Sequence, residues 1–260
     1  MKIDFLTTDI GRGHRFYLEG LLREVRRLAP DVETEFFLAP ELSHGISRFF
    51  WRMARALYHS GSRPGFVGAC YNRFRRSQSP GGSSIAHSAL GRDLRRWLQT
   101  RSNHAAAVVV DHPLLVELLI HQTNRPPVVY MHGELVAPEE SLTCADLTLV
   151  PTNEVLRRFV ESGCQEERLA LTGLCVESAL VPLADSARLV RLRRISEGAA
   201  LTGAFFTSGA EPARHCDQIL RAALSLPKTT QRSLVFARFG GRFEHLVRPY
   251  TGDHIELLVC

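Results

Sequence analysis

The chain has 260 residues, of which 45% are hydrophobic and 23% are charged, a composition that suits one large or two smaller buried cores and argues against disorder. No apolar run approaches the roughly 18–20 residues that span a bilayer. The amino terminus carries an early charge at Asp4 and lacks the apolar segment of a signal peptide. We therefore expect a cytoplasmic protein.

The cysteines are scattered, with neither a C-x-x-C pair nor the spacing of a metal site. They are Cys70, Cys144, Cys164, Cys175, Cys216 and Cys260. In a chain without an export signal, we expect reduced thiols that are mostly buried.

Residues 1–39 predict a strand, a glycine-containing loop, a helix and a second strand. Residues 2–8 are apolar enough for a short buried strand, and residues 16–29 carry apolar side chains at helical spacing with arginines between them. Residues 31–39 have the alternation and aromatics of a strand. This order is the first β-α-β unit of a doubly wound sheet.

Residues 43–101 interrupt that order and are strongly basic. They contain eleven arginines and one acid, Asp93, a net charge of +10, whereas the whole chain carries +5 and the remainder therefore −5. Residues 44–60 predict an amphipathic helix rich in Phe, Trp and Arg, and residues 85–100 predict another helix. Such a segment prefers an anionic partner. A membrane surface and an ordinary surface helix both fit, whereas no nucleic-acid-binding motif accompanies the charge.

Strands and helices alternate again from residue 104 onward. The expected strands are 104–111, 126–134, 145–152 and 167–178, and the expected helices are 113–122 and 153–163. Pro113 stands at a favoured early helix position, and Thr152 or Asn153 caps the next helix.

The domain organisation follows from these elements. We expect an amino-terminal Rossmann-like domain over 1–180, with the basic insertion 43–101, and a linker over 181–198. Residues 199–260 then begin a second Rossmann-like domain. Only about half of the units that such a domain needs are present. The fold class is α/β.

The stretch TTDIGRGHRFYLEG, residues 7–20, has three possible interpretations. Gly11 and Gly13 would let backbone N–H groups approach an anion at the start of the next helix. His14 could act as a general base or bind a diphosphate. The stretch could also be only a tight bend, because Phe16 replaces the third glycine of a dinucleotide-binding fingerprint and no Walker A lysine follows.

Two further polar groups follow predicted strands. They are Asp111 with His112, and His132 with Gly133 and Glu134. A histidine beside a carboxylate is an acid–base pairing, and the ends of parallel strands are where open α/β sheets place their sites. The alternative is that these residues cap helices or fasten loops. We expect His132 and Glu134 to line the functional cleft.

Taken in order, these motifs resemble those of GT-B glycosyltransferases, particularly the family 28-like branch of monogalactosyldiacylglycerol synthase and MurG. That branch has GGGH or GGTGGH in its first loop, where this chain reads DIGRGH, with Gly11, Gly13 and His14 matching and Arg12 departing. The resemblance continues through VVVDHPLLVELLI, PPVVYMHGE, CADLTLVPTNEVLRRFVESG, LALTGLCVESAL and GAFFTSGAE. It covers residues 1–25 and 105–215.

The resemblance implies a metal-independent hexosyltransferase that moves a sugar from a nucleotide donor, UDP-linked, to a hydroxyl acceptor such as a lipid at the inner face of the membrane. A cofactor is not implied, because the nucleotide sugar is a co-substrate. By position, the catalytic residues would be His14 and Glu134. The substrate-binding residues would be Gly11, Gly13, Asp111 and His132, and the donor-binding residues would be Gly173, Thr207, Ser208 and Gly209.

Two other functions remain open at this point. Relatives bind the uridine with a later loop and a glutamate, and the sequence stops before that part. The chain could therefore be a non-catalytic or split-subunit relative, acting as a membrane-associated scaffold or requiring a partner chain to complete the donor domain. A nucleotide-sugar epimerase of related fold is the third interpretation.

Overall fold

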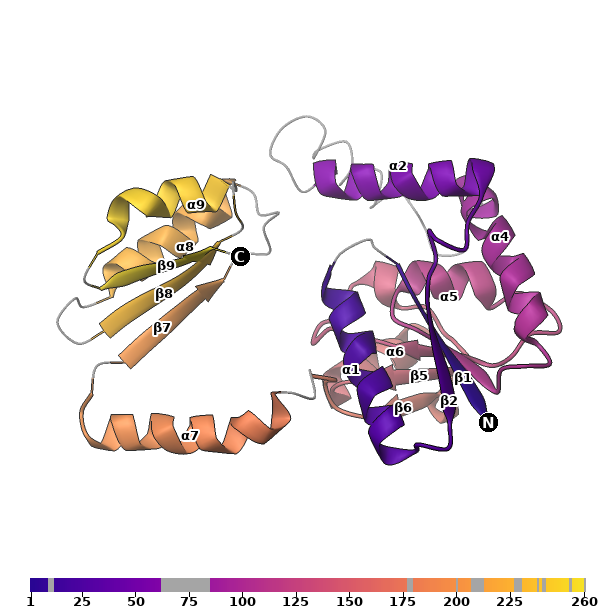
Figure 1. The fold of residues 1–260 in the computed structure, drawn as a ribbon, viewed down its shortest axis with the longest axis horizontal. Helices are drawn as coiled ribbons and strands as arrows, with labels where there is room; N and C mark the ends of the chain where they lie inside the picture. Colours follow the sequence, from indigo (N-terminus) through magenta and orange to yellow (C-terminus); the bar gives the residue numbers. More distant parts are fainter. Residues whose placement is uncertain are drawn as a thin grey trace. The chain divides into compact units, whose positions relative to one another are not determined.

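The computed structural model describes residues 1–8, 12–61, 85–176, 180–199, 201–206, 213–226, 231–237, 239, 242–252 and 254–259. The chain divides into two compact units, which are treated separately below (Figure 1). The first unit comprises Met1–Ala56 and Arg76–Val181, and the second comprises Leu57–Arg75 and Pro182–Cys260. Both are built from parallel strands and helices, which confirms the predicted α/β class.

The first unit contains a parallel sheet with the order β2-β1-β3-β4-β5-β6. Its strands are β1 (Lys2–Thr7), β2 (Glu33–Leu38), β3 (Ala107–Val110), β4 (Val128–Met131), β5 (Leu147–Val150) and β6 (Leu169–Leu171). Its helices are α1 (Arg12–Leu28), α2 (Gly45–Gly61), α4 (Ile85–Arg101), α5 (Pro113–Leu119) and α6 (Asn153–Glu161), with 3-10 turns η1 (Glu139–Ser141) and η2 (Glu166–Arg168).

The strand order contains a reversal at β1. The chain moves from β1 outward to β2, then returns to the other side of β1 to form β3 and continues outward from there. In open α/β sheets, such a reversal opens a crevice outside the carboxyl ends of the two central strands. The carboxyl ends of β1 and β3 are therefore the first place to look for a site.

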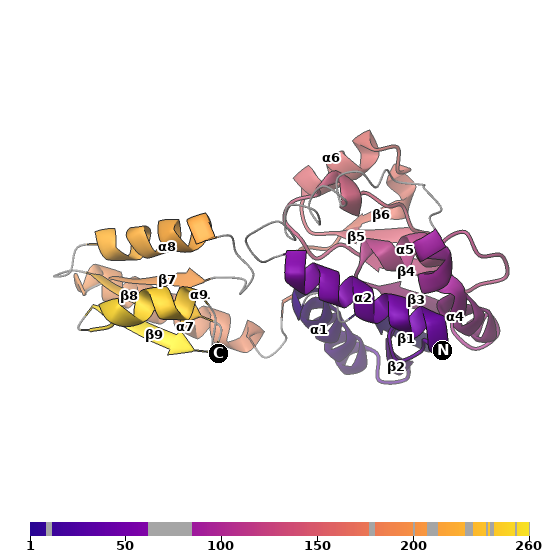
Figure 2. The same cartoon turned by 90° about the horizontal axis from the view of Figure 1, so that it is seen from above.

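Helices cover both faces of this sheet. On one face, α1 packs on a cluster whose buried members are Phe5, Leu18, Leu22, Val109 and Met131. Phe36 of β2 packs against this cluster, whereas its neighbour Phe37 contacts the ring of Trp97 in α4 at 5.0 Å between centroids. Because successive strand residues point to opposite faces, α1 and α4 lie on opposite sides of the sheet. Helix α2 lies at the edge of the first unit in Figure 1, and in the view from above it is drawn in front of α1 (Figure 2).

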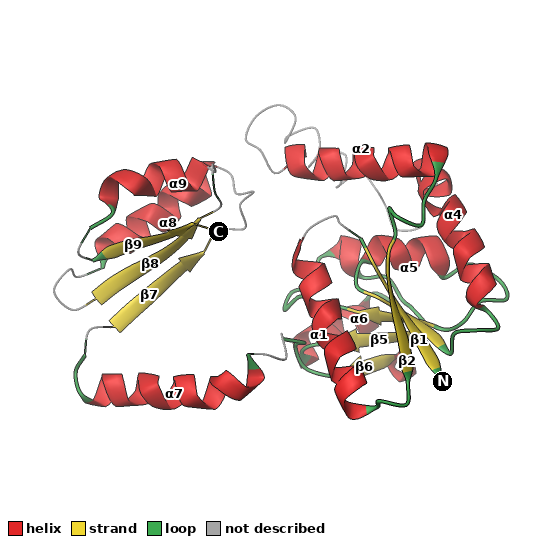
Figure 3. Cartoon of the chain, viewed as in Figure 1, coloured by secondary structure: helices red, strands yellow, loops and turns green. Residues whose placement is uncertain are grey.

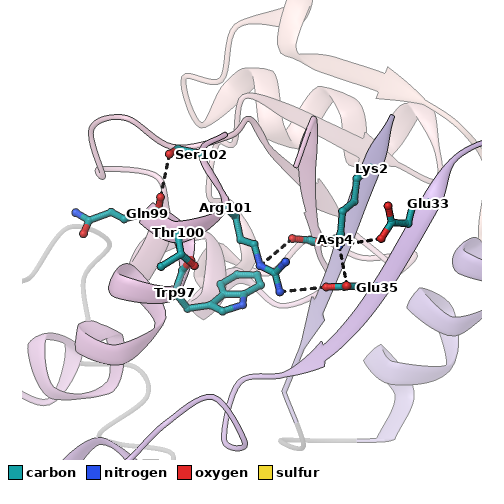
Figure 4. Close-up of polar contacts among 9 residues, drawn as sticks. All are labelled: Lys2, Asp4, Glu33, Glu35, Trp97, Gln99, Thr100, Arg101 and Ser102. Atoms are coloured by element: carbon teal, nitrogen blue, oxygen red, sulfur yellow. Dashed lines mark hydrogen bonds and ion pairs between the residues drawn. The ribbon is translucent and has the colours of Figure 1, made fainter. Parts of the chain in front are cut away.

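The amino-terminal edge of this sheet holds a network of paired charges (Figure 4). Arg101, the last residue of α4, lies 3.4 Å from the fully buried carboxylate of Asp4 and 3.0 Å from that of Glu35. Lys2 in turn contacts Glu35 at 2.7 Å and Glu33 at 3.0 Å. Burial raises the pKa of Asp4, and the positive charge of Arg101 opposes that shift. The Arg101 guanidinium also lies 4.7 Å from the centre of the Phe37 ring. These contacts tie the end of α4 to β1 and β2.

We predict that Arg101→Met lowers the free energy of unfolding by about 3 kcal/mol, because removing one partner leaves a buried charge uncompensated. Arg96→Met is the matched control: its side chain is 75% exposed and lies 3.9 Å from Asp93, so the change should stay within about 0.5 kcal/mol. Urea denaturation measures both variants. Adding Asp4→Asn to Arg101→Met should recover part of the loss, and equal effects of Arg96→Met and Arg101→Met would contradict the assignment.

The second unit contains a parallel sheet of β7 (Leu201–Phe206), β8 (Gln231–Ala237) and β9 (Ile255–Val259). Its helices are α7 (Val181–Ser196), α8 (Ala213–Ser225) and α9 (Arg242–Val247), followed by η3 (Arg248–Tyr250). Both α8 and α9 lie on the same side of the strands (Figure 3), where Leu220, Val235 and Phe243 are buried together. Among the described residues of α7, none is buried.

One prediction about the cysteines was wrong. Cys144 and Cys164 form a disulfide, with their Cα atoms 5.6 Å apart. Cys144 precedes β5 and Cys164 follows α6, so both lie where the chain enters neighbouring parallel strands at the amino-terminal edge. The sequence separates them by 20 residues and gives no sign of this proximity. Cys175 and Cys216 are not disulfide-bonded, and Cys70 and Cys260 lie outside the described residues.

Candidate functional site

The strand reversal brings a threonine and an aspartate together. Leu6 of β1 is paired with Val110 of β3, so Thr7 and Asp111 follow side by side at the carboxyl edge. The Thr7 hydroxyl donates a hydrogen bond to Asp111 Oδ2 at 2.5 Å. Thr7, Thr8 and Asp111 are all buried. The end of β1 and the end of β3 thus form a single polar cluster.

Asp111 is the most perturbed acid of this edge. Its side chain is almost wholly buried, and this burial raises its pKa to about 7, against the opposing effect of the hydrogen bond from Thr7. Its Oδ1 atom has no hydrogen-bond partner within the described part of the chain. A carboxyl group that gains or loses a proton near neutral pH, with one oxygen unmatched, is suited to proton transfer or to binding a hydroxyl group.

Helix α1 begins beside this cluster. Only residues 9–11 separate Thr8 from Arg12, the first residue of α1. The helix has 17 residues, and its free N–H groups and dipole favour an anion at its amino end. The loop after β1 is shorter than the sequence predicted, because Gly13 and His14 belong to the first turn of α1. The side chain of His14 and the whole of Gly11 lie outside the described residues.

The histidine beside Asp111 has a structural contact. His112 is the N-cap residue of α5, and its Nδ1 accepts a hydrogen bond from the backbone N–H of Leu114 at 3.2 Å. Pro113 follows at the first position of the helix, as predicted. Of the two interpretations of this histidine, the geometry favours helix capping.

His132 fastens the loop that follows β4. The ring is buried, with Nε2 3.1 Å from the carbonyl oxygen of Val136 and Nδ1 3.2 Å from the Tyr130 hydroxyl. Because a carbonyl only accepts, Nε2 carries the proton, and Nδ1 accepts from the tyrosine. Phe159 packs edge-on against the same ring at 5.3 Å between centroids. Both ring nitrogens are thus engaged in positioning the loop that presents Glu134, which is half-exposed.

Gly133 allows this loop to approach α1. A Cβ atom at this position would lie 2.6 Å from Cδ2 of Tyr17, closer than real side chains approach. The loop after β4 therefore packs directly on the first turns of α1, next to the edge occupied by Asp111. The sequence alone did not predict a role for Tyr17 or Thr7, because a tyrosine within a helix and a threonine at the end of a strand are common in any α/β protein. The hydroxyl residue at the end of the first strand was the one feature that could have indicated Thr7.

The predicted donor-binding residues are less fully described. Gly173 follows β6 in an exposed segment with a φ of +80°, a conformation that favours glycine. Thr207, Ser208 and Gly209 lie outside the described residues. Across the described ranges, no group of three or more His, Cys, Asp or Glu side chains is placed to hold a metal ion, and no helix is long and apolar enough to cross a membrane.

Comparison with known proteins gives a result at the level of fold. No protein-family model and no curated protein sequence matches the chain. Solved structures do match. A Staphylococcus aureus MnaA–UDP structure has a TM-score of 0.56 at 12% identity, covering 100% of this chain and 68% of that chain. The UDP-GlcNAc 2-epimerase of Neisseria meningitidis, bound to UDP-GlcNAc, has a TM-score of 0.55 at 10% identity, covering 100% and 72%.

A third match is the UDP-N-acetylglucosamine 2-epimerase of Rickettsia bellii, with a TM-score of 0.50 at 13% identity, covering 99% of this chain and 68% of that chain. The chain has a GT-B-like fold. This confirms the predicted fold class. Two of these structures are described as UDP-GlcNAc 2-epimerases, and none of the three is described as a member of the MurG branch, so the narrower resemblance has no support from them.

The raised pKa of Asp111 predicts an unusual pH dependence of stability. Its pKa is about 7 in the folded chain and near 3.9 when unfolded. Between these values the folded chain keeps a proton that the unfolded chain has lost, so the free energy of unfolding falls as pH rises, by up to about 1.4 kcal/mol per pH unit. Asp111→Asn should remove this slope and make the protein more stable than the parent at pH 8, as measured by urea denaturation.

Asp146→Asn provides the control for this measurement. Partial burial alone would raise the pKa of Asp146, but the hydrogen bonds from Arg125 and from the Val128 N–H hold this pKa below its usual value. Its neutralisation should therefore reduce stability at pH 8. If Asp111→Asn also destabilised the protein at pH 8, that result would contradict the raised pKa of Asp111.

Proposed function

We propose that the chain acts on a nucleotide sugar, UDP-linked, and transfers the sugar to a hydroxyl acceptor, with the carboxyl edge of the first unit as the reacting site. The observation that carries this proposal is Asp111, a buried carboxyl with a pKa near neutrality beside the amino end of α1. The shared fold supports it, because two of the solved structures contain UDP or UDP-GlcNAc.

The chemistry requires a proton acceptor and a site for the leaving diphosphate. The acceptor hydroxyl gives up its proton as its oxygen bonds to the anomeric carbon, and the bond from that carbon to the diphosphate oxygen breaks, releasing UDP. The N–H groups at the start of α1 would stabilise the negative charge of the diphosphate. His14 or Glu134 would take the proton, with Gly11 and Gly13 allowing close approach.

Within this proposal, Asp111 binds the reacting hydroxyl and His132 positions the loop that carries Glu134. Gly173, Thr207, Ser208 and Gly209 belong to the donor side. The proposed acceptor is a lipid hydroxyl, which would place the protein peripherally at the inner face of the membrane. The nucleotide sugar is a co-substrate, and the proposal includes no separate cofactor.

Two observations favour other functions of the same fold. Two of the matched structures are described as UDP-GlcNAc 2-epimerases, and a carboxyl that titrates near neutrality suits proton transfer on a sugar as well as on an acceptor. Within the described second unit, β7 pairs with β8 alone, and its sequence LTGAFF carries no charge. Uncharged edge strands readily accept another strand, which supports a split-subunit protein completed by a partner chain.

We predict that UDP-GlcNAc, at about one hundred times its Kd, raises Tm by roughly 5 °C through selective binding to the folded state. His14→Ala should abolish turnover. His104→Ala is the matched control, because His104 is exposed and precedes β3 at the opposite edge of the sheet. Differential scanning fluorimetry and release of UDP measure the two effects.

The products separate the candidate functions. Release of UDP that depends on a hydroxyl acceptor supports transfer, whereas free UDP with an altered sugar and no acceptor supports epimerisation. Binding of UDP-GlcNAc without turnover supports the split-subunit alternative. Full activity of His14→Ala would remove His14 from the mechanism, and the absence of any thermal shift with nucleotide sugars would contradict the proposal as a whole.

A further inference from the structure

The Cys144–Cys164 disulfide encloses one strand and one helix of the first unit. Cys144 precedes β5, and Cys164 follows α6 at a sequence separation of 20 residues. The bond therefore ties the end of α6 to the segment that enters β5, at the edge of the sheet opposite to Asp111. The sugar transfer proposed above makes no use of this bond, so its role lies in what it holds in place.

Cys144 ends the connection that carries Glu134. This connection leaves β4 at His132 and passes through η1 before it reaches Cys144. Its residues 132–143 form the β4–β5 loop. Near the start of this loop, the His132 ring bonds to the carbonyl oxygen of Val136 at 3.1 Å, and the disulfide follows directly after its last residue. The loop is thus held by a hydrogen bond near one end and by a covalent bond at the other.

Helix α6 connects the disulfide to the same loop by a second route. Phe159 of α6 is fully buried, and its ring centroid lies 5.3 Å from that of His132 and 6.3 Å from that of Tyr130. The backbone N–H of Cys164 donates a hydrogen bond to the carbonyl oxygen of Phe159 at 3.0 Å. Because coupling is carried by hydrogen bonds and packed side chains, a change at Cys164 reaches the histidine that fastens the β4–β5 loop.

The first unit has the contacts to stay folded without this bond. Strand β5 is paired on both sides, with β4 and with β6. The Thr152 hydroxyl caps α6 by accepting a hydrogen bond from the Val155 N–H at 3.2 Å, and Val155 is buried. Asp146 accepts a hydrogen bond from Arg125 at 3.1 Å just before β5 begins. Opening the disulfide therefore acts locally, on the loop and the end of α6, as a switch between two folded states requires.

The two cysteines differ in their access to solvent. Cys164 is 5% exposed, whereas Cys144 is half-buried, so an incoming thiolate reaches Cys144 more readily. Its attack on Cys144 Sγ breaks the S–S bond and forms a mixed disulfide, and Cys164 leaves as a thiolate that takes up a proton. The second thiol of a dithiol reductant then displaces Cys144. The reductant is thereby oxidised by two electrons to a disulfide, and both cysteines end as thiols.

We propose that the Cys144–Cys164 disulfide is a redox switch for the β4–β5 loop. In the oxidised chain the bond keeps the loop ordered, and reduction by a dithiol frees its end and loosens the packing of Phe159 on His132. For its effect on sugar binding, the inference rests on the proposed function, which places Glu134 at the reacting site. That function also places the protein at the inner face of the membrane, a reducing environment in which disulfides are commonly redox-sensing.

The test is hydrogen exchange of the full chain, measured by mass spectrometry before and after treatment with dithiothreitol in the absence of denaturant. Alkylation of Cys144 and Cys164 in the same samples reports the state of the bond. After reduction, we expect amides of the β4–β5 loop to exchange at least about tenfold faster, whereas those of β1 and β3 stay protected. The reduced chain should also bind UDP-GlcNAc at least about tenfold more weakly, because the ordered loop becomes a minor state.

Two variants isolate the bond. Cys144→Ser cannot form it, and this variant should show the fast loop exchange with no further effect of dithiothreitol. Cys175→Ser is the matched control, because Cys175 is also a half-buried cysteine of the first unit but is not disulfide-bonded. It should respond to dithiothreitol as the parent does.

Three results would overturn the switch. They are a bond that resists dithiothreitol in the folded chain, loop exchange that is unchanged by reduction, and loss of protection throughout the first unit, which would show that the bond supports the whole fold. Faster loop exchange with unchanged binding of UDP-GlcNAc would support the switch and count against a reacting site at Glu134. Absence of UDP-GlcNAc binding in both states would contradict the proposed function alone, because loop exchange still decides the switch.

Discussion

The hydrogen bond between Thr7 and Asp111 is the constraint around which the first unit is arranged. A carboxyl group buried at this depth costs free energy whenever it ionises, and one hydrogen bond offsets only part of that cost. The parallel pairing of β1 with β3 fixes both residues at the point where the strand order reverses. The amino end of α1 lies a few residues beyond Thr7, so the acid, the helix dipole and the crevice are set by the same topology.

The two edges of the sheet each bury an aspartate whose pKa is raised by burial. At the amino-terminal edge, Asp4 lies 3.4 Å from the Arg101 cation, although neither of its oxygens has a hydrogen-bond partner among the described residues. At the carboxyl edge, Asp111 has a hydroxyl on one oxygen and no described partner on the other. The positive charge of Arg101 favours the ionised form of Asp4, whereas only hydrogen bonds oppose the shift at Asp111. Acids whose pKa is strongly shifted are common at functional sites.

Much of this architecture could be predicted from periodicity and turn chemistry. The strands, the helices, the Pro113 helix start and the Thr152 cap follow from local patterns. Contacts between distant residues could not be predicted this way. Thr7 and Asp111 are separated by 104 residues, and the Cys144–Cys164 disulfide depends on how parallel strands enter the sheet. Helical spacing likewise could not distinguish the buried Trp51 from the exposed Phe49, because their difference arises from the packing of α2 on α4.

The central claim is that the carboxyl edge of the first unit binds the nucleotide sugar. The most direct measurement is a titration of isotopically labelled protein with UDP, followed by amide chemical shifts. The account predicts that the largest shifts occur at the first residues of α1 and at Thr8, which lie at that edge. Shifts confined to Arg101 and His104 at the opposite edge, or no saturable shifts at all, would contradict it.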